Sequence, residues 1–240
     1  MASSGEEVHL LVFTHPRVWG SGLSAWLIRL EEARVRERRP AGAPVRVSAF
    51  SGNEAAFRLF RSLGYEHVRT FWVMEITLED APPVPVSAEG IDIRSFERGR
   101  DERAVYAALS EAFEDHWGSG MPSFERWVRT DVEGSRSDLS VWFVATDGNE
   151  VVGAATCTTS SPHDDVAQVT MLGVRRGWRR RGVALSLLRT AFAEFHRRGI
   201  PRAELGVDSS NPTGATRLYE RAGMHVVRSW EVWEKRVSAA

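Results

Sequence analysis

The chain has 240 residues, of which 42% are hydrophobic and 26% charged. These proportions exclude a disordered chain and a membrane protein, and the length allows one large domain or two domains of roughly 100 to 200 residues each. The formal net charge of −1 argues against binding nucleic acid or an anionic membrane through the overall field of the protein, so we expect neither as a partner.

The first residues predict neither a secretory signal nor a membrane anchor. Glu6 and Glu7 stand where a signal peptide carries basic residues, and the apolar run Leu10–Phe13 is short. No stretch approaches the roughly 18 continuous apolar residues of a membrane helix. Cys157 has no second cysteine to pair with, and we expect it to be a buried small hydrophobic residue rather than a nucleophile. These features predict a cytoplasmic protein.

A break in composition divides the chain near residue 80. The segment EDAPPVPVSAEG interrupts all periodicity, and residues 81–90 are predicted to be a proline-rich linker between domains. After it we expect a strand at 91–94, helices at 102–113 and 123–132, a hairpin of strands 141–146 and 151–158 around the turn 147–149, a strand at 166–174, a helix at 184–198, a strand at 203–207, a helix at 213–222 and two closing strands within 224–236. This order predicts the α/β (α+β) class, with a mixed central sheet and helices on both faces.

The first 80 residues repeat the second half of the later domain. A strand and a turn with Gly22 open the first copy, and a strand and a turn with Gly182 stand at the matching place in the second. NEAAFRLFRSLGYEHVRTFWVMEI from Asn53 then parallels NPTGATRLYERAGMHVVRSWEVWEK from Asn211. Residues 1–80 are therefore predicted to be a partial, degenerate copy of a domain that is complete at 91–240.

The partial copy lacks the opening strands and helices of the fold, and nothing before His9 supplies them. Either the chain begins further upstream, or the half-module docks its sheet edge and apolar faces on the second domain or on another copy of the chain. An open sheet edge is an association hazard. We therefore expect a route to homodimers.

The turn from Arg179 to Ala184 carries the clearest chemical signal. It follows a strand and opens an amphipathic helix, so its backbone N–H groups and the helix dipole suit a phosphate or pyrophosphate. Gly182 and Ala184 leave room for an anion to approach the backbone. Two other interpretations remain open for this arginine-rich run, a solvated basic turn and a nucleic-acid patch.

The turn and the segment after it resemble the GNAT acetyltransferase superfamily, whose pyrophosphate turn reads Q/R-x-x-G-x-G/A. The matching residues, in order, are Arg179, Gly182, Ala184, Asn211, Ala215, Leu218, Tyr219 and Gly223. The resemblance covers residues 91–236 as a complete domain and 9–78 as a partial one, and the tandem arrangement is similar to that of the mycothiol synthases. Asn211 and Ala215 are four residues apart where the family usually has three, with the extra residue in Pro212–Gly214.

The resemblance implies acetyl-CoA as the donor and no metal. Its pyrophosphate would bind the amides of Arg180, Arg181, Gly182, Val183 and Ala184, with Arg179 and Asn211 nearby. Its pantetheine arm would pair with the backbone of Leu172, Gly173 and Val174 in a notch where two strands splay, and the N–H of Leu172 would polarise the thioester carbonyl.

Tyr219 matches the family tyrosine that protonates the departing thiolate. A phenol of pKa about 10 donates to a thiolate of pKa about 8.5 to 9 with little mismatch. The competing interpretation is a core tyrosine on an amphipathic helix. The first copy has Trp19, Ser24 and Phe60 where the second has Arg179, Ala184 and Tyr219, so the first copy is expected to be structural or regulatory.

A general base is harder to predict. Many family members carry a carboxylate on the strand at 166–174, but this chain has Gln168 and Thr170 there. Asp115 and His116 in the run EAFEDHWG are the catalytic candidates, with Glu111 and Asp208 as further substitutes. Each of these also suits a helix-end charge or a loop residue.

The expected function is transfer of an acetyl group from acetyl-CoA to a primary amine of a small molecule or a protein. An acidic rim would favour a cationic amine as acceptor; it would comprise Glu111, Asp115, Asp164, Asp165 and Asp208. The alternative is a non-catalytic CoA-binding sensor or regulatory module, which the missing strand carboxylate favours and the retained Tyr219 disfavours.

Overall fold

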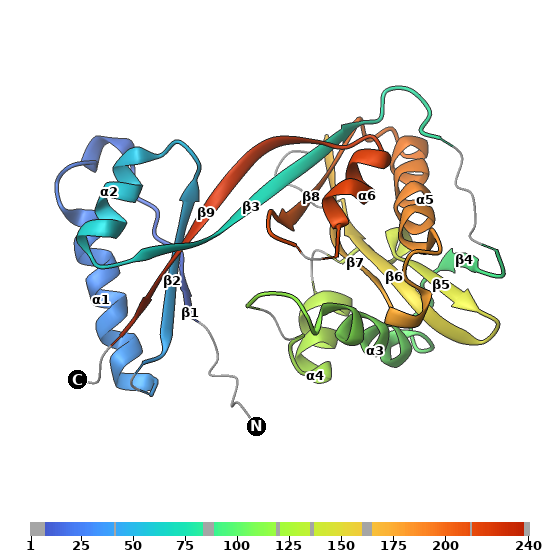
Figure 1. The fold of residues 1–240 in the computed structure, drawn as a ribbon, viewed down its shortest axis with the longest axis horizontal. Helices are drawn as coiled ribbons and strands as arrows, with labels where there is room; N and C mark the ends of the chain where they lie inside the picture. The colour runs from blue at the N-terminus through green and yellow to red at the C-terminus, as the bar shows by residue number, and fades with distance from the viewer. Residues whose placement is uncertain are drawn as a thin grey trace. The chain divides into compact units, whose positions relative to one another are not determined.

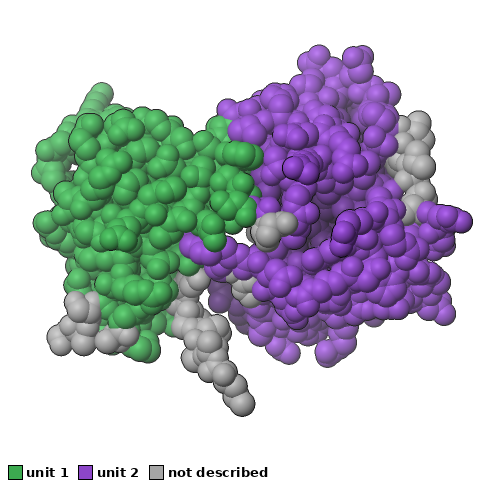
Figure 2. Space-filling view, in the orientation of Figure 1, with its two compact units in different colours: residues 1–72, 208–210, 228–240 green, residues 73–207, 211–227 purple. Residues whose placement is uncertain are grey.

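The computed structural model describes residues 8–40, 42–83, 89–118, 121–134, 137–159, 165–211 and 213–237. The chain divides into two compact units, which Figure 2 shows in different colours. Unit 1 comprises residues 1–72, 208–210 and 228–240, and unit 2 comprises 73–207 and 211–227. The divide differs from the predicted one at residue 80, because the C-terminal segment belongs to the unit that holds the N-terminus.

Unit 1 is built on strands from both ends of the chain (Figure 1). Its elements are β1 (Val8–Leu10), a 3-10 turn (Pro16–Val18), α1 (Leu23–Arg38), β2 (Pro44–Phe50), α2 (Glu54–Ser62) and the first part of β3 (Glu66–Thr77). β1 runs parallel to β2, and β2 runs antiparallel to β9 (His225–Arg236). In that pairing Pro44 lies opposite Arg236 and Phe50 lies opposite Trp230.

The hydrophobic core of unit 1 depends on the end of the chain. Trp233 of β9 is 4% exposed and stacks on Phe57 with ring centroids 5.6 Å apart. Val237 is 2% exposed and belongs to the same core cluster. Lys235 adds an ion pair, because its Nζ lies 3.0 and 3.1 Å from the two carboxylate oxygens of the buried Glu32. The sheet of the predicted half-module is therefore extended beyond β2 by β9, from the C-terminal segment of the chain.

Unit 2 holds the remaining elements around a mixed sheet. They are β4 (Asp92–Ser95), α3 (Glu102–Phe113), α4 (Phe124–Trp127), a π-helical turn (Val128–Val132), a 3-10 turn (Leu139–Val141), β5 (Phe143–Asp147), β6 (Glu150–Thr158), β7 (Val166–Val174), a 3-10 turn (Arg176–Trp178), α5 (Val183–Arg197), β8 (Arg202–Asp208, of which Asp208 is assigned to unit 1) and α6 (Ala215–Arg221). The strand order is β8-β7-β6-β5-β4, with β7 parallel to β8 and the other neighbours antiparallel.

Helices cover both faces of this sheet, as predicted (Figure 1). A Cβ on Gly173 of β7 would lie 2.8 Å from Leu109 and 2.9 Å from Ala112, both on α3. A Cβ on Gly153 of β6 would lie 3.4 Å from Leu187 on α5. Gly153 pairs with the residue after Gly173, and successive strand residues point to opposite faces. α3 and α5 therefore pack on opposite sides.

Two predicted elements differ from the structure. The two closing strands expected within 224–236 are one strand of 12 residues, β9, because the sequence HVVRSWEVWEKR contains no glycine, proline or asparagine to turn the chain. The helix expected at 123–132 begins as α4 and continues as a π-helical turn from Val128. Of the predicted linker, residues 84–88 lie outside the described residues.

Candidate active site

The turn before α5 has the geometry of an anion site. Gly182 is the N-cap of α5 with φ +88°, and the first helical hydrogen bond runs from the Ser186 N–H to the Gly182 carbonyl at 3.0 Å. The N–H groups of the first helical turn, from Gly182 to Leu185, therefore have no partner inside the helix. With the helix dipole behind them, they suit a negatively charged group.

Arg180 is strained in this turn. Its φ is +62°, and it is the one non-glycine residue with positive φ in the described part of the chain. The left-handed conformation costs a non-glycine residue about 1–2 kcal/mol. Such strain is typical of functional sites. Arg180 also makes no hydrogen bond or ion pair with any described residue, so its guanidinium is free to meet a ligand.

Other arginines of the turn are held by carboxylates of the protein. Arg175 Nε lies 3.2 Å from Glu111, and Arg181 Nη1 lies 3.8 Å from Asp147. Arg176 donates to both oxygens of Asp115 at 2.9 and 3.0 Å. These pairs neutralise much of the basic run, which weakens the nucleic-acid interpretation of the turn.

Arg179 joins two elements of unit 2. Its Nε donates to the Val174 carbonyl at 3.2 Å, and its Nη2 donates to the Ala112 carbonyl near the end of α3 at 3.1 Å. The residue therefore connects the end of β7 to α3. The sequence predicts Arg179 beside the pyrophosphate, but here its side chain is bonded to carbonyl groups of the protein.

Asp115 and His116 lie next to the turn. Asp115 is half exposed and paired with Arg176, and its Oδ2 is 4.0 Å from Arg179. Its side-chain hydrogen bond raises the pKa of Arg176. The ring of His116 packs against Phe113 with centroids 4.4 Å apart. This arrangement gives Asp115 a role in fixing the turn.

The notch predicted beside β7 is present in the strand pairing. β8 pairs with β7 at Val166, Ala167 and Gln168, and no later described residue of β7 pairs with β8. On the other side, β7 pairs with β6 as far as Val174. β7 has a bulge at Thr170, between Met171, which pairs with Thr156 of β6, and Val169, which pairs with Cys157. The bulge lies two residues beyond Gln168, where the pairing of β7 with β8 ends.

The N–H of Leu172 points into this notch. The Arg175 N–H donates to the Val152 carbonyl at 2.9 Å, which makes Arg175 and Val152 a hydrogen-bonded pair. Such pairs alternate along an antiparallel ladder. Gly173 therefore turns its backbone groups toward β6, and Leu172 and Val174 turn theirs away from β6, toward the unpaired edge. This is the orientation that a strand-like ligand arm would require.

Tyr219 of α6 is 8% exposed. Burial raises the pKa of its phenol to about 12, because the charged phenolate is disfavoured where water is excluded. The side chain is therefore neutral over the physiological range and able to donate a proton. Phe60, at the matching place in unit 1, is buried in the core against Tyr65 and Trp233.

Asn211 forms a local turn. Its Oδ1 accepts from the Thr213 N–H at 2.8 Å and from the Thr213 hydroxyl at 2.6 Å, while Gly214 is the N-cap of α6 with φ +75°. Asn53, at the matching place in unit 1, instead caps α2 by accepting from the Ala56 N–H at 3.1 Å. The extra residue in 212–214, of which Pro212 lies outside the described residues, separates Asn211 from its helix.

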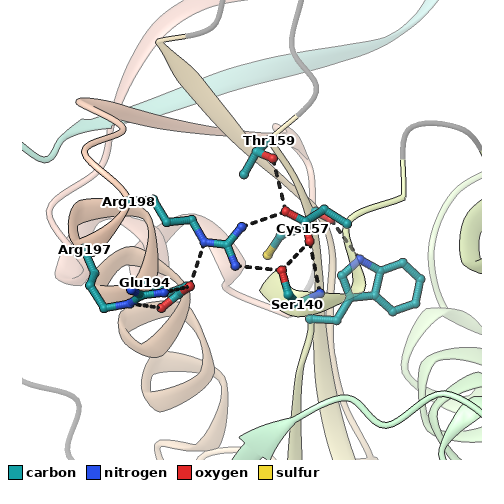
Figure 3. A network of polar contacts seen from close by, with 8 residues as sticks. Ser140, Cys157, Thr159, Glu194, Arg197 and Arg198 are labelled. Carbon is teal, nitrogen blue, oxygen red and sulfur yellow. Dashed lines mark hydrogen bonds and ion pairs between the residues drawn. The ribbon is translucent and has the colours of Figure 1, made fainter.

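The far end of α5 is anchored by Arg198 (Figure 3). Its guanidinium donates to Asp138 and to the Ser140 hydroxyl, both at 2.7 Å, and to Glu194 at 2.7 Å. Cys157 lies close by in the same view; it is 2% exposed, and burial raises the pKa of its thiol. The prediction that Cys157 is buried is confirmed, and the network holds the helix whose N-terminus forms the anion turn.

The predicted acidic rim is largely consumed by ion pairs. Asp165 pairs with Arg202, Asp208 lies 3.8 Å from Arg69, and Glu111 pairs with Arg175. Asp164 lies outside the described residues.

Sequence reasoning missed the bulge at Thr170 and the link from Arg179 to α3, and neither has a local sequence signature.

Within the described ranges, no group of three or more histidine, cysteine, aspartate or glutamate side chains is arranged to hold a metal ion. In the same part of the chain, no helix has both the length and the apolar character needed to cross a bilayer.

A splayed strand pair, an anion turn at a helix N-terminus and a buried tyrosine are arranged as the predicted acetyltransferase site requires. Residues 103–224 match the model of the acetyltransferase (GNAT) family. The chain belongs to this family and is an N-acetyltransferase with the GNAT fold.

Three known proteins show the likeness. Mycothiol acetyltransferase from Thermobispora bispora is 32% identical over 213 residues, which are 87% of this chain and 70% of that protein. A GCN5-related N-acetyltransferase from Sphaerobacter thermophilus has a crystal structure with TM-score 0.80 and 38% identity, covering 95% of this chain and 72% of that one. A tandem GNAT protein from the clavulanic acid biosynthesis pathway has TM-score 0.74 at 15% identity, over 99% of this chain and 77% of that one, which shows the fold alone.

Proposed function

We propose that unit 2 transfers an acetyl group from acetyl-CoA to the primary amine of a small molecule, by direct attack of the amine on the thioester. The observation that carries the proposal is the unpaired edge of β7, which turns the N–H of Leu172 outward and ends at the anion turn. A pantetheine arm that pairs along this edge brings its pyrophosphate to the N-terminus of α5.

The donor contacts follow from that placement. The amides of Gly182, Val183 and Ala184 would bind the pyrophosphate, with the guanidinium of Arg180 beside it. The backbone of Leu172 and Val174 would pair with the arm. A single N–H donor on the thioester oxygen, here that of Leu172, contributes on the order of 100 to 1,000-fold in rate.

Tyr219 would protonate the departing thiolate. Its phenol, with a pKa of about 12, is fully protonated at neutral pH and does not compete as a base. We do not assign the base role to Asp115, because both of its oxygens accept from Arg176. His116 packs on Phe113 and is kept as part of the wall of the acceptor site.

The acceptor is proposed by analogy with the named relatives. Mycothiol acetyltransferases match most of this chain at about 30% identity. The amine that lacks the acetyl group of mycothiol is therefore the first acceptor to test, beside simpler primary amines. Unit 1 is proposed to be a partial, degenerate GNAT copy without catalytic activity, because Phe60 offers no proton where Tyr219 does.

Thermal unfolding with and without acetyl-CoA, followed by CoA release in the presence of an amine panel, tests the proposal. A ligand that binds the folded state stabilises it by about 2.7 kcal/mol at 100 times its Kd. We expect acetyl-CoA to stabilise the wild type and Tyr219→Phe equally, and only the wild type to release CoA rapidly. Phe60→Tyr is the matched control, and it should leave turnover unchanged.

Two results would count against the proposal. Stabilisation without CoA release from any amine would favour the sensor interpretation. No stabilisation of either protein would remove the anion turn as the donor site.

A further inference from the structure

Glu204 of β8 is a buried carboxylate to which the proposed reaction has so far given no role; it is 6% exposed. Resting on the proposed function, we propose that Glu204 takes the proton from the acceptor ammonium, directly or through one water. It would supply from β8 the carboxylate that related enzymes carry on the strand equivalent to β7.

The strand register brings Glu204 to the notch. Gln168 and Glu204 are Cα partners in the parallel pairing of β7 with β8. Residues in register on neighbouring strands point to the same face, with strands about 4.8 Å apart. Gln168 is also the last residue of β7 that β8 pairs with before the two strands part. Glu204 therefore lies at the apex of the notch.

Gln168 and Glu204 point to the face of the sheet that α3 covers. Gly173, whose missing Cβ would meet α3, pairs with Ala154 of β6. Thr158 lies four residues further along β6, so it points to the same face, and it pairs with Gln168. Gln168 and Glu204 consequently face the side opposite α5, the helix whose N-terminus would hold the donor.

β7 itself offers no group that can accept a proton on this face. Gln168 carries a neutral amide. Thr170 is committed to β6, since its hydroxyl donates to the Thr156 carbonyl at 2.9 Å and lies 2.8 Å from the Thr156 hydroxyl. A general base must lie within hydrogen-bond reach of the proton or reach it through one water. Glu204, on the strand next to Gln168, can meet this requirement.

The charged neighbour of Glu204 is Arg202, which is itself paired with two other carboxylates. Arg202 precedes it by two residues on the same strand face, and Arg202 Nη1 lies 3.4 Å from Glu75 of β3. Asp165, just before β7, also pairs with Arg202. β3 is adjacent to β8 here, because the Leu78 N–H donates to the Pro201 carbonyl at 2.7 Å. Arg202 thus offsets part of the charge of Glu75 and Asp165, and of these carboxylates only Glu204 is in register with Gln168 at the notch.

The proton balance of the step is complete without a further reactant. One proton leaves the ammonium for Glu204 before attack and passes to solvent. The free amine then forms the C–N bond to the acetyl carbon, and the C–S bond breaks. The second proton lost by the nitrogen replaces the one that Tyr219 gives to the thiolate.

Moving the carboxylate between the two strands tests the proposal. The readouts are kcat for CoA release from acetyl-CoA with the best amine of the panel, the pH profile of kcat/KM, and thermal stabilisation by acetyl-CoA. We expect Glu204→Gln to lower kcat about 100 to 10,000-fold, the usual contribution of a general base, with unchanged stabilisation by acetyl-CoA. The double variant Glu204→Gln with Gln168→Glu should regain at least about tenfold of that loss. Glu75→Gln, which removes a neighbouring carboxylate, is the control and should retain wild-type turnover.

Each alternative outcome has a definite meaning. Wild-type turnover and an unchanged acidic limb of the pH profile in Glu204→Gln would overturn the proposal. If Glu204→Gln is less stable, the double variant decides: a folded protein that binds acetyl-CoA but regains no activity would show that Glu204 is structural. Failure of the proposed function would appear in the wild type, as absence of CoA release with every amine, whereas failure of this inference appears in the variants alone.

Discussion

Trp19 and Arg179 make the same hydrogen bond in the two units. The indole Nε1 of Trp19 donates to the Thr14 carbonyl at 3.0 Å, and Nε of Arg179 donates to the Val174 carbonyl at 3.2 Å. In each case the acceptor lies five residues earlier; Val174 is the last residue of β7, whereas Thr14 lies four residues after the end of β1. The turn in unit 1 therefore repeats this backbone contact with a tryptophan in place of the arginine, and Trp19 is 65% exposed.

Replacing Arg180, the residue after Arg179, should change stability and acetyl-CoA binding in opposite directions. Gly20 has φ +80° where Arg180 has φ +62°. Arg180→Gly should remove the left-handed strain and raise the free energy of unfolding by up to about 1 kcal/mol. The same change should weaken acetyl-CoA binding and reduce its dependence on salt, because a cation near the pyrophosphate is lost. Denaturant unfolding and ligand titration at two salt concentrations measure both effects; equal or tighter binding would exclude Arg180 from the donor site.

Gly173 controls how closely α3 approaches β7. Because its missing Cβ would lie 2.8 Å from Leu109 and 2.9 Å from Ala112, Gly173→Ala should destabilise unit 2 by about 1–3 kcal/mol. It should also reduce stabilisation by acetyl-CoA, since α3 borders the notch. Gly177→Ala is the matched control, because a Cβ there meets nothing within 4 Å. Equal unfolding midpoints for the two variants would contradict this packing of α3 on β7.

Trp233 should be essential to unit 1 although it lies near the end of the chain. Removing a buried large aromatic side chain costs about 3–5 kcal/mol, and Trp233 is 4% exposed against Phe57. We expect Trp233→Ala to lower the thermal midpoint strongly. Trp26→Ala, in the same unit but 58% exposed, should have little effect. A small shift for Trp233→Ala would show that β9 is dispensable for this core.

Asp101 should contribute stability that acid removes. Burial on its own would raise the pKa of Asp101, but the hydrogen bonds from Arg94 and from the Glu97 N–H outweigh it and leave the pKa lowered. A lowered pKa in the folded state stabilises the protein above the unfolded value of about 3.9, and that stabilisation is lost as the pH falls through the folded pKa. Asp101→Asn should therefore be about 1–3 kcal/mol less stable at pH 7.

The difference between this variant and the wild type should shrink as the pH falls below the unfolded value of about 3.9, for example on going from pH 7 to pH 3. Urea unfolding at both pH values measures the two differences. A gap that persists unchanged in acid would mean that the charge of Asp101 is not what stabilises the fold.

Local patterns predict most of unit 2. Alternation locates β5 to β8, and Gly182 at the start of an amphipathic run locates the anion turn. The ion pair between Arg176 and Asp115 joins residues 61 positions apart, and the placement of Glu204 beside Gln168 depends on a sheet register. Neither is written in a local pattern, so sequence reasoning favours Asp115 as the base and passes over Glu204.

The membership of residues 228–236 of β9 in unit 1 is also a long-range property. Its alternation predicts a strand but not its neighbour, and β2 provides that neighbour from about 180 residues earlier in the chain. The repeat alone suggests that each copy closes with its own strand.

The place of Trp233 and Val237 in the core of unit 1 also sets an order of events during synthesis. Domains usually fold as they leave the ribosome, N-terminal part first, at about 5–20 residues per second. Here the core that contains Phe57 and Phe60 cannot be completed until residues 233–237 have been translated. Until then Phe57, Phe60 and Tyr65 lack the side chains of Trp233 and Val237 that pack against them in the folded unit.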